Sequence, residues 1–252
     1  MDLTKKEKRI VLFLLGIPLF LTAFLMFPHY EEFSAPGEIV EVTELGIQGH
    51  VHVTYVYGGT TKNYLEKLLV WGRLAEVDVH FQPVSQEEAI REEEIEEEVG
   101  SAIQQWGIAN ALEVSGYAAE EADAFEAKFE EIEEKAAKYQ GSSFGLMVAI
   151  GLVEEERNID FSQAGQYRIA GTGTIEQDGS VGSIAAVRDK VETAERSDID
   201  YFFIPEDKED YPGEGMSNQE EAEQYVKEHQ LRVKLVPVAS LDEALAFLET
   251  LP

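Results

Sequence analysis

The sequence predicts an α/β protein that follows one membrane-spanning helix. In the second half of the chain, segments with the apolar patterns of strands alternate with segments of helical spacing. Before them, residues 28–83 show strand, helix and strand patterns in turn, and an uncharged apolar run, residues 10–27, comes first. The 252 residues, 44% of them hydrophobic, are enough for one sizeable core or for a core with a small accessory lobe.

Residues 10–27 are predicted to be the transmembrane helix of a single-pass membrane protein. At about 1.5 Å per residue, this run just crosses a hydrocarbon core. Basic residues in the predicted cytoplasmic tail 1–9 precede it and Glu31-Glu32 follow it. The N-terminus is therefore expected in the cytoplasm and the rest of the chain outside. The alternative is a cleaved signal peptide, whose apolar region would be shorter and would end at an Ala-x-Ala-like site; none is found near Phe27.

The chain is strongly acidic, with a net charge of −30. Residues 1–27 hold four of the 20 basic and two of the 50 acidic residues, so the expected extracytoplasmic part has 16 basic and 48 acidic residues, a net charge of −32. Nucleic acid is excluded as an expected partner, because phosphate binding needs clustered Lys and Arg. The acidity also disfavours binding along anionic lipid, and it indicates a well-solvated surface or attraction of basic peptides. The absence of cysteine excludes disulfides, thiol catalysis and cysteine-based zinc sites.

Residues 28–117 are expected to form a small extracytoplasmic α/β region. The elements predicted from period and turn residues are a Pro36-Gly37 turn, strands 38–45 and 50–57, an end to the second strand at Gly58-Gly59, a helix 61–74 and a strand 76–82. His50 and His52 share a face at this spacing. No third ligand lies near them in the sequence, so no metal site is expected.

Two helices are predicted to follow this strand. The first begins at a capping box in residues 85–88, continues at helical spacing and ends at Gly116. Its six glutamates in residues 92–98 are interpreted as a solvated face rather than a cation site. The second helix occupies an amphipathic connector, residues 118–140. Its apolar stripe, expected in the core, consists of Phe125, Phe129, Ile132, Ala136 and Tyr139.

A serine flanked by small residues precedes the next apolar helix. The segment Gly141-Ser142-Ser143-Phe144-Gly145 is followed at once by the apolar run 146–153. This layout is expected to place the Ser143 hydroxyl at the first turn of a helix, where free N–H groups and the helix dipole can stabilise an oxyanion. Gly and Ser also begin ordinary helices, so the segment alone does not establish a catalytic serine.

The remainder of the chain alternates regularly. The predicted elements are strands 167–175, 199–204 and 231–237, helices 181–194, 218–229 and 241–251, a turn at Gln177-Asp178-Gly179 and an acidic loop 206–217.

From the serine onward, the sequence resembles the proteolytic domain of Lon-type serine–lysine peptidases. That family has a Gly-x-Ser-x-Gly serine at the start of a helix, a Thr-Gly strand, a turn, and a helix that carries the catalytic lysine. The matching positions are Ser143, Thr172-Gly173, Asp178-Gly179, Ala185-Ala186-Val187 and Lys190. The similarity continues through residues 201–205 and 236–245, and covers residues 141–252. It implies a Lon-like domain that uses Ser143 and Lys190 as catalytic residues and needs no cofactor or metal. The supporting residues that it implies are Thr172, Gly141 and Gly145.

Because a predicted transmembrane helix precedes this domain, the chain resembles in particular the membrane-anchored, ATP-independent Lon-like proteases of bacteria, which are located in the cell membrane. No Gly-x-x-x-x-Gly-Lys-Ser/Thr phosphate loop occurs in the chain. The sequence departs from these relatives in three ways. It has no room for their PDZ domain between Gly116 and Gly141, a helical segment replaces their extended lead-in to the serine, and Phe144 is bulkier than the residue they favour. Relatives with the full domain often form rings, so a homo-oligomer is compatible with the resemblance.

The chemistry requires a lysine that is neutral near working pH, because a serine hydroxyl is a weak nucleophile until a base takes its proton. A helix would place apolar neighbours beside Lys190: Ala186, Val187, Val191 and Ala194. The alternative is a surface lysine, since Arg188, Asp189 and Glu192 indicate a wet face. The resemblance implies that Thr172 hydrogen-bonds the lysine. Ser142 is the competing nucleophile, outside the centre of the motif.

Two functions follow. The first is a membrane-anchored extracytoplasmic Ser–Lys endopeptidase that hydrolyses polypeptides without ATP. The second is a catalytically silent Lon-like domain that serves as a cell-envelope scaffold or adaptor. The missing PDZ domain, the helical lead-in and Phe144 favour the scaffold, whereas the intact set of Ser143, Thr172 and Lys190 favours the enzyme.

Overall fold

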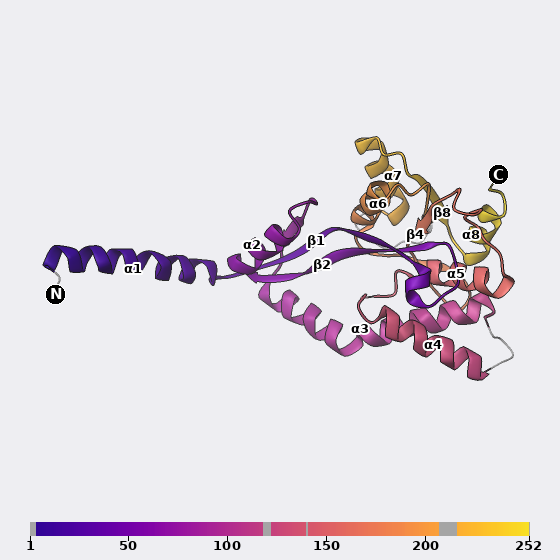
Figure 1. Ribbon diagram of the computed structural model, residues 1–252, viewed down its shortest axis with the longest axis horizontal. Helices are drawn as coiled ribbons and strands as arrows, with labels where there is room; N and C mark the ends of the chain where they lie inside the picture. The colour runs from indigo at the N-terminus through magenta and orange to yellow at the C-terminus, as the bar shows by residue number, and fades with distance from the viewer. Residues whose placement is uncertain (1–3, 118–121, 140, 207–215, 252) are drawn as a thin grey trace. The chain divides into compact units, whose positions relative to one another are not determined.

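The computed structural model describes residues 4–117, 122–139, 141–206 and 216–251 (Figure 1). The described chain is mixed α/β, as predicted. It divides into two compact units that are not contiguous in sequence. The N-terminal unit comprises the chain up to Ala35 together with Tyr57–Glu93, and the C-terminal unit comprises Pro36–Val56 together with the chain from Glu94 onward.

The N-terminal unit begins with the helix α1 (Lys5–Leu25), whose first turn is closed by a capping box between Thr4 and Glu7. Of the described helices, α1 is the one long and apolar enough to cross a membrane, judged by length and composition. The other elements are the first part of β1 (Pro28–Glu41), the last part of β2 (His52–Asn63), α2 (Tyr64–Arg73), β3 (His80–Pro83) and the start of α3 (Gln86–Ser115). Strand β3 pairs antiparallel with β1, with Glu31 opposite Pro83.

Several predicted boundaries in residues 28–83 were wrong. The strand β1 runs straight through Pro36-Gly37 instead of turning there. A Cβ on Gly37 would lie 2.3 Å from the Tyr55 carbonyl oxygen, so glycine here allows a close approach of two backbones and makes no turn. The expected strand 38–45 ends at Glu41 and continues as a short 3-10 helix, η1 (Val42–Leu45), which Gly46 closes with φ +85°.

The boundaries of β2, α2 and β3 also differ from the prediction, because a pair of glycines was interpreted as the end of a strand. Strand β2 continues through Gly58-Gly59 to Asn63, whose side-chain oxygen accepts the Glu66 N–H and so caps α2. The helix therefore begins three residues later than expected, and β3 is shorter than the predicted strand 76–82. His50 precedes β2, and His52 Nδ1 lies 3.0 Å from the Ile169 carbonyl oxygen, so the two histidines do not form the expected face of one strand.

The predictions for the two long helices were confirmed within the described residues. The helix α3 follows the predicted capping box, in which Ser85 Oγ accepts the Glu88 N–H and Glu88 Oε2 accepts the Ser85 N–H. The helix α4 (Ala122–Ala136) carries the predicted stripe up to Ala136: Ile132 and Ala136 are fully buried, and the aromatic members pack against the same core. Tyr139 packs there from three residues beyond the end of the helix, which is shorter than predicted. Residues 118–121 and 140 of the predicted connector lie outside the described residues, as do 1–3 of the tail and 207–215 of the acidic loop.

The sheet of the C-terminal unit runs in the order β1-β2-β4-β7-β8. The strands β4 (Ile169–Gly171), β7 (Tyr201–Pro205) and β8 (Lys234–Val238) continue from β2 with parallel pairing at each step. Parallel neighbours need crossover connections, and each connection here contains a helix. The connection from β2 to β4 includes α5 (Gly145–Arg157), that from β4 to β7 includes α6 (Val187–Arg196) and that from β7 to β8 includes α7 (Asn218–His229), whereas α8 (Leu241–Leu248) follows β8.

Helices cover the sheet on both faces. Phe203 of β7 packs into a core that includes residues of α5 and α8, whereas Phe202 and Ile204 pack into a second cluster with residues of α6 and α7. Alternate residues of a strand point to opposite faces, so one buried strand serves both cores. This explains why the segment around β7 is almost continuously apolar in the sequence.

Two predicted elements around the site were wrong. The expected strand 167–175 is split into β4 and β5 (Thr174–Ile175), with Thr172-Gly173 between them. The expected helix 181–194 begins only at Val187, because residues Val181–Gly182 form β6, the antiparallel partner of β5. The turn predicted at residues 177–179 is present, with Gly179 at φ +79°.

Candidate active site

Ser143 lies in the turn that leads into α5, one residue before the N-cap residue Phe144. It therefore precedes the first helical turn in which the sequence placed it. The side chain of Phe144 is 5% exposed and packs in the hydrophobic core, so it anchors the turn to the core. Ser143 itself is half-buried.

The backbone of Ser143 is held by the break between β4 and β5. Its carbonyl oxygen accepts the Gly173 N–H at 2.7 Å and the Thr172 hydroxyl at 3.0 Å. The Gly173 carbonyl in turn accepts the Leu146 N–H at 3.1 Å. The ladder stops at Gly173. The Thr172 N–H still donates to the Phe203 carbonyl of β7 at 2.9 Å, whereas the N–H and the carbonyl of Gly173 bond the serine turn and the start of α5. Gly145 fits here because a Cβ would lie 3.0 Å from Ile175 Cγ2.

Lys190 is buried and its amine reaches the serine. Only 4% of the residue is exposed, so the alternative of a surface lysine was wrong. Its Nζ lies 2.8 Å from Ser143 Oγ and 3.1 Å from Thr172 Oγ1, and both distances are in the range of a hydrogen bond. Thr172 is fully buried; it accepts from the lysine while it donates to the Ser143 carbonyl. The resemblance implied this contact with Thr172.

Burial lowers the pKa of Lys190 from 10.5 to about 7. The neighbours that remove water are apolar, and Val187, Val191 and Ala194 are each fully buried in the same cluster. Among the described residues, no carboxylate forms an ion pair with this amine. Asp189, interpreted from the sequence as part of a wet face, is 3% exposed, and Arg188 pairs with Glu221 of α7 on the exposed side of α6.

Helix α3 supports the serine turn in a way the sequence did not reveal. At Gly107 a Cβ would lie 3.0 Å from Ser142 Cβ, so the helix backbone and the turn are in close contact. One turn later, the buried Asn110 donates through Nδ2 to the Ile175 carbonyl of β5. In the sequence, the only indication of this support is a glycine followed three residues later by an asparagine within a helical pattern, and many helices contain such a pair. The turn directs Ser143, not Ser142, to the amine of Lys190.

We expect Gly107→Ala to slow a reaction that uses the Ser143 hydroxyl about tenfold, without unfolding the protein. The added Cβ must push Ser142, and a displacement of a few tenths of an ångström next to the candidate nucleophile Ser143 affects the reaction rate far more than stability. Alanine also favours the helix by about 1 kcal/mol, which offsets the contact. Turnover and thermal unfolding of the full chain in detergent micelles would be compared with Gly72→Ala, where a Cβ meets nothing within 4 Å. Unchanged turnover in Gly107→Ala would show that α3 does not position the serine.

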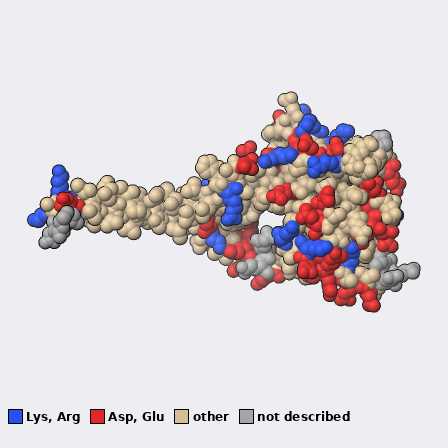
Figure 2. All heavy atoms as spheres, viewed as in Figure 1, with Lys and Arg blue, Asp and Glu red and all other residues tan. Residues whose placement is uncertain are grey.

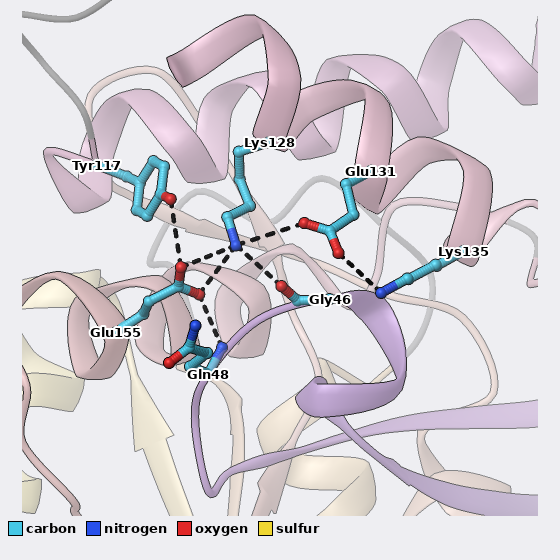
Figure 3. A network of polar contacts seen from close by, with 7 residues as sticks. All are labelled: Gly46, Gln48, Tyr117, Lys128, Glu131, Lys135 and Glu155. Atoms are coloured by element: carbon cyan, nitrogen blue, oxygen red, sulfur yellow. Dashed lines mark hydrogen bonds and ion pairs between the residues drawn. The ribbon is translucent and has the colours of Figure 1, made fainter.

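The helical lead-in α4 is bound to α5 by the network drawn in Figure 3. Lys128 of α4 lies 2.8 Å from Glu155 Oε1 of α5 and donates to the Gly46 carbonyl at 2.9 Å. Glu155 also accepts the Gln48 N–H at 2.7 Å and the Tyr117 hydroxyl at 3.2 Å. Burial opposes the charge of Lys128, but the bond to Glu155 raises the pKa of the amine above its ordinary value. The helical segment that precedes Ser143 is thus fixed to the helix that follows it.

Comparison of the chain with models of known protein families gives no match, and comparison with curated proteins gives none either. The case for a catalytic site therefore rests on the arrangement of Ser143, Thr172 and Lys190.

Proposed function

We propose that this protein is a membrane-anchored Ser–Lys endopeptidase that cleaves polypeptides outside the cytoplasm without ATP. The observation that carries the proposal is the 2.8 Å distance between the Lys190 amine and the Ser143 hydroxyl, joined to the burial that holds the amine near neutrality. A buried lysine with no carboxylate partner among the described residues is costly to the fold, and such groups occur where their chemistry is used.

The reaction would proceed by acyl transfer. Neutral Lys190 takes the proton of Ser143 as Oγ attacks the carbonyl carbon of the peptide, and the ammonium then gives that proton to the departing amine nitrogen. The acyl-serine ester is hydrolysed by a water whose proton passes to Lys190, and the proton returns to Ser143 when the ester breaks. The N–H groups of Ser143 and Phe144 form no hydrogen bond with any described residue, which leaves them available to the oxyanion.

Membrane attachment is the second part of the proposal. Helix α1 is long and apolar enough to span, and the basic residues before it favour a cytoplasmic N-terminus in the cell membrane. Figure 2 shows Asp and Glu gathered over α4 in the C-terminal unit. The net charge of −32 after residue 27 should enrich basic chains near the enzyme, more strongly at low salt.

The test is a time course of the full chain in detergent micelles with a denatured basic protein, without ATP. New peptide fragments support the enzyme. An inert protein across pH and salt would instead support the alternative, a catalytically silent scaffold. Protease shaving of intact cells tests the topology, because a fully protected C-terminal unit would contradict it.

The pH dependence of turnover follows from Lys190. Since the base must be neutral, turnover should rise about tenfold per pH unit below pH 7 and level off above the lysine pKa of about 7. The profile is measured under single-turnover conditions, so that release of product does not mask the chemical step. A rate that is constant from about pH 5 to 9 would exclude Lys190 as the base.

A further inference from the structure

The helix α2 of the N-terminal unit leaves Leu68, Leu69 and Trp71 of its apolar side in solvent. Leu68 is 50% exposed, Leu69 60% and Trp71 63%, and no residue of α2 is buried. At 100° per residue, one side of the helix carries Tyr64, Leu65, Leu68, Leu69, Trp71 and Gly72. A helix that packs on a protein core normally turns this side inward.

The opposite side of α2 is the one that packs against the protein. Lys67 Nζ lies 2.6 Å from Glu31 Oε2 on β1, and the same amine sits 4.5 Å from the ring centre of Phe81 on β3. Glu31 is buried and Lys67 is half-buried, so this ion pair lies where α2 packs on the sheet of the unit. The polar contacts therefore set the rotation of α2 about its axis, and they direct its leucines and tryptophan away from the sheet.

The start of α2 is attached to the end of the apolar helix. The ring of Tyr64 stacks on Phe24 of α1 at 5.2 Å with an interplanar angle of 4°, and on His29 of β1 at 4.3 Å. Phe24 is the last residue but one of α1 and stands three residues before the end of the apolar run at Phe27. On the face seen in Figure 2, no basic or acidic side chain lies on α1 between its ends. Where α1 leaves a hydrocarbon core, the start of α2 is therefore beside it.

We propose that α2 is an interfacial helix that inserts Leu68, Leu69 and Trp71 into the headgroup–acyl boundary of the bilayer that α1 crosses. The inference rests on the membrane attachment in the proposed function. Tryptophan is enriched at this boundary, and an amphipathic helix with basic residues on its polar side, here Lys67 and Arg73, is typical of such contacts. The acidity of the whole chain favours a zwitterionic leaflet over an anionic one. Together α1 and α2 hold the N-terminal unit at the membrane by two attachments.

The chain has two tryptophans, so Trp106→Phe leaves Trp71 as the single tryptophan emitter. The full-length variant is reconstituted into phosphatidylcholine vesicles with or without bromine on the acyl chains. Trp71 fluorescence should be blue-shifted, quenched about twofold or more by the brominated lipid, and protected from acrylamide in the water. The matched control moves the tryptophan to the polar side of the same helix with Trp71→Phe, Arg73→Trp and Trp106→Phe, and it should be quenched less by the lipid.

Each other outcome overturns the inference. Trp71 that is unquenched by bromine and open to acrylamide places α2 in water. Trp71 that is blue-shifted but unquenched by bromine, in a chain that cross-links to itself, places α2 against a second copy. Flotation of the vesicles separates the two proposals. If the chain floats with the vesicles and Trp71 is unquenched, only the interfacial role of α2 is contradicted. If the chain does not float, membrane attachment by α1 is contradicted as well. Circular dichroism of each variant confirms that it is folded.

Discussion

Ser143→Ala and Lys190→Ala should each reduce turnover of a denatured basic protein by about a thousandfold or more, and the double variant should be no slower than either single one. In the proposed mechanism the nucleophile and its base act as one unit, since the Lys190 amine and the Ser143 hydroxyl share a hydrogen bond of 2.8 Å. Losing either member removes the whole acyl-transfer route, so the effects do not add. The measurement is the initial rate of fragment formation by the full chain in detergent micelles.

Ser142→Ala is the matched control, because it removes a hydroxyl one residue away and keeps the Cβ that faces Gly107. It should retain a rate close to that of the wild type. Cleavage by Ser143→Ala at the wild-type rate, or loss of activity in Ser142→Ala alone, would refute Ser143 as the nucleophile.

The variant Lys190→Met tests how the buried amine affects the stability of the fold, apart from its proposed role in catalysis. The folded-state pKa of about 7 lies below the unfolded value of 10.5, so between these pH values the unfolded chain binds the extra proton. In the wild type, this one group makes stability rise with pH by up to about 1.4 kcal/mol per unit between pH 7 and 10.5. The methionine variant should lack this rise and be at least as stable at pH 7, although it is inactive. Unfolding of Lys190→Met at pH 7 would contradict this account of the buried amine.

Lys128→Ala should lower the free energy of unfolding by about 3 kcal/mol. The change leaves Glu155, whose side chain is 14% exposed, without its cation, and it leaves the Gly46 carbonyl without its donor. Removing one member of a buried pair costs more than the pair contributes, because a charge stays buried without compensation. Thermal or chemical unfolding of the full chain in detergent micelles would measure the loss.

The control for this prediction is Lys135→Ala on the same helix. Lys135 pairs with Glu131 at 2.8 Å, but both side chains are more than 40% exposed, and such pairs contribute little. A double-mutant cycle of Lys128→Ala with Glu155→Gln should show coupling, since the two residues are in contact. Equal and small effects of Lys128→Ala and Lys135→Ala would mean that the network of Figure 3 does not hold α4 to α5.

Local patterns in the sequence determined the class of the fold and most of its elements. The apolar run of α1, the capping box of α3, the stripe of α4 and the helix α7 were predictable because each depends on residues within a few turns of one another. The same holds for the candidate residues Ser143 and Lys190, which were found through a spaced motif and its resemblance to a family. Predictions failed where glycine and proline were interpreted as turns, as at Pro36-Gly37 and Gly58-Gly59, although the chain stays extended there.

Only the tertiary structure decided what depends on contacts distant in sequence. The break after Thr172 exists because the N–H and the carbonyl of Gly173 bond the serine turn and the start of α5, about thirty residues earlier, instead of a neighbouring strand. Glu154 looks like the polar end of a helix, yet it is 1% exposed and accepts the N–H groups of His50 and Phe161, and burial raises its pKa. The burial of Lys190 likewise depends on contacts between segments that are distant in sequence. An amine is held neutral by exclusion of water, and one helix supplies only some of the residues that exclude it; the packing of the whole unit supplies the rest.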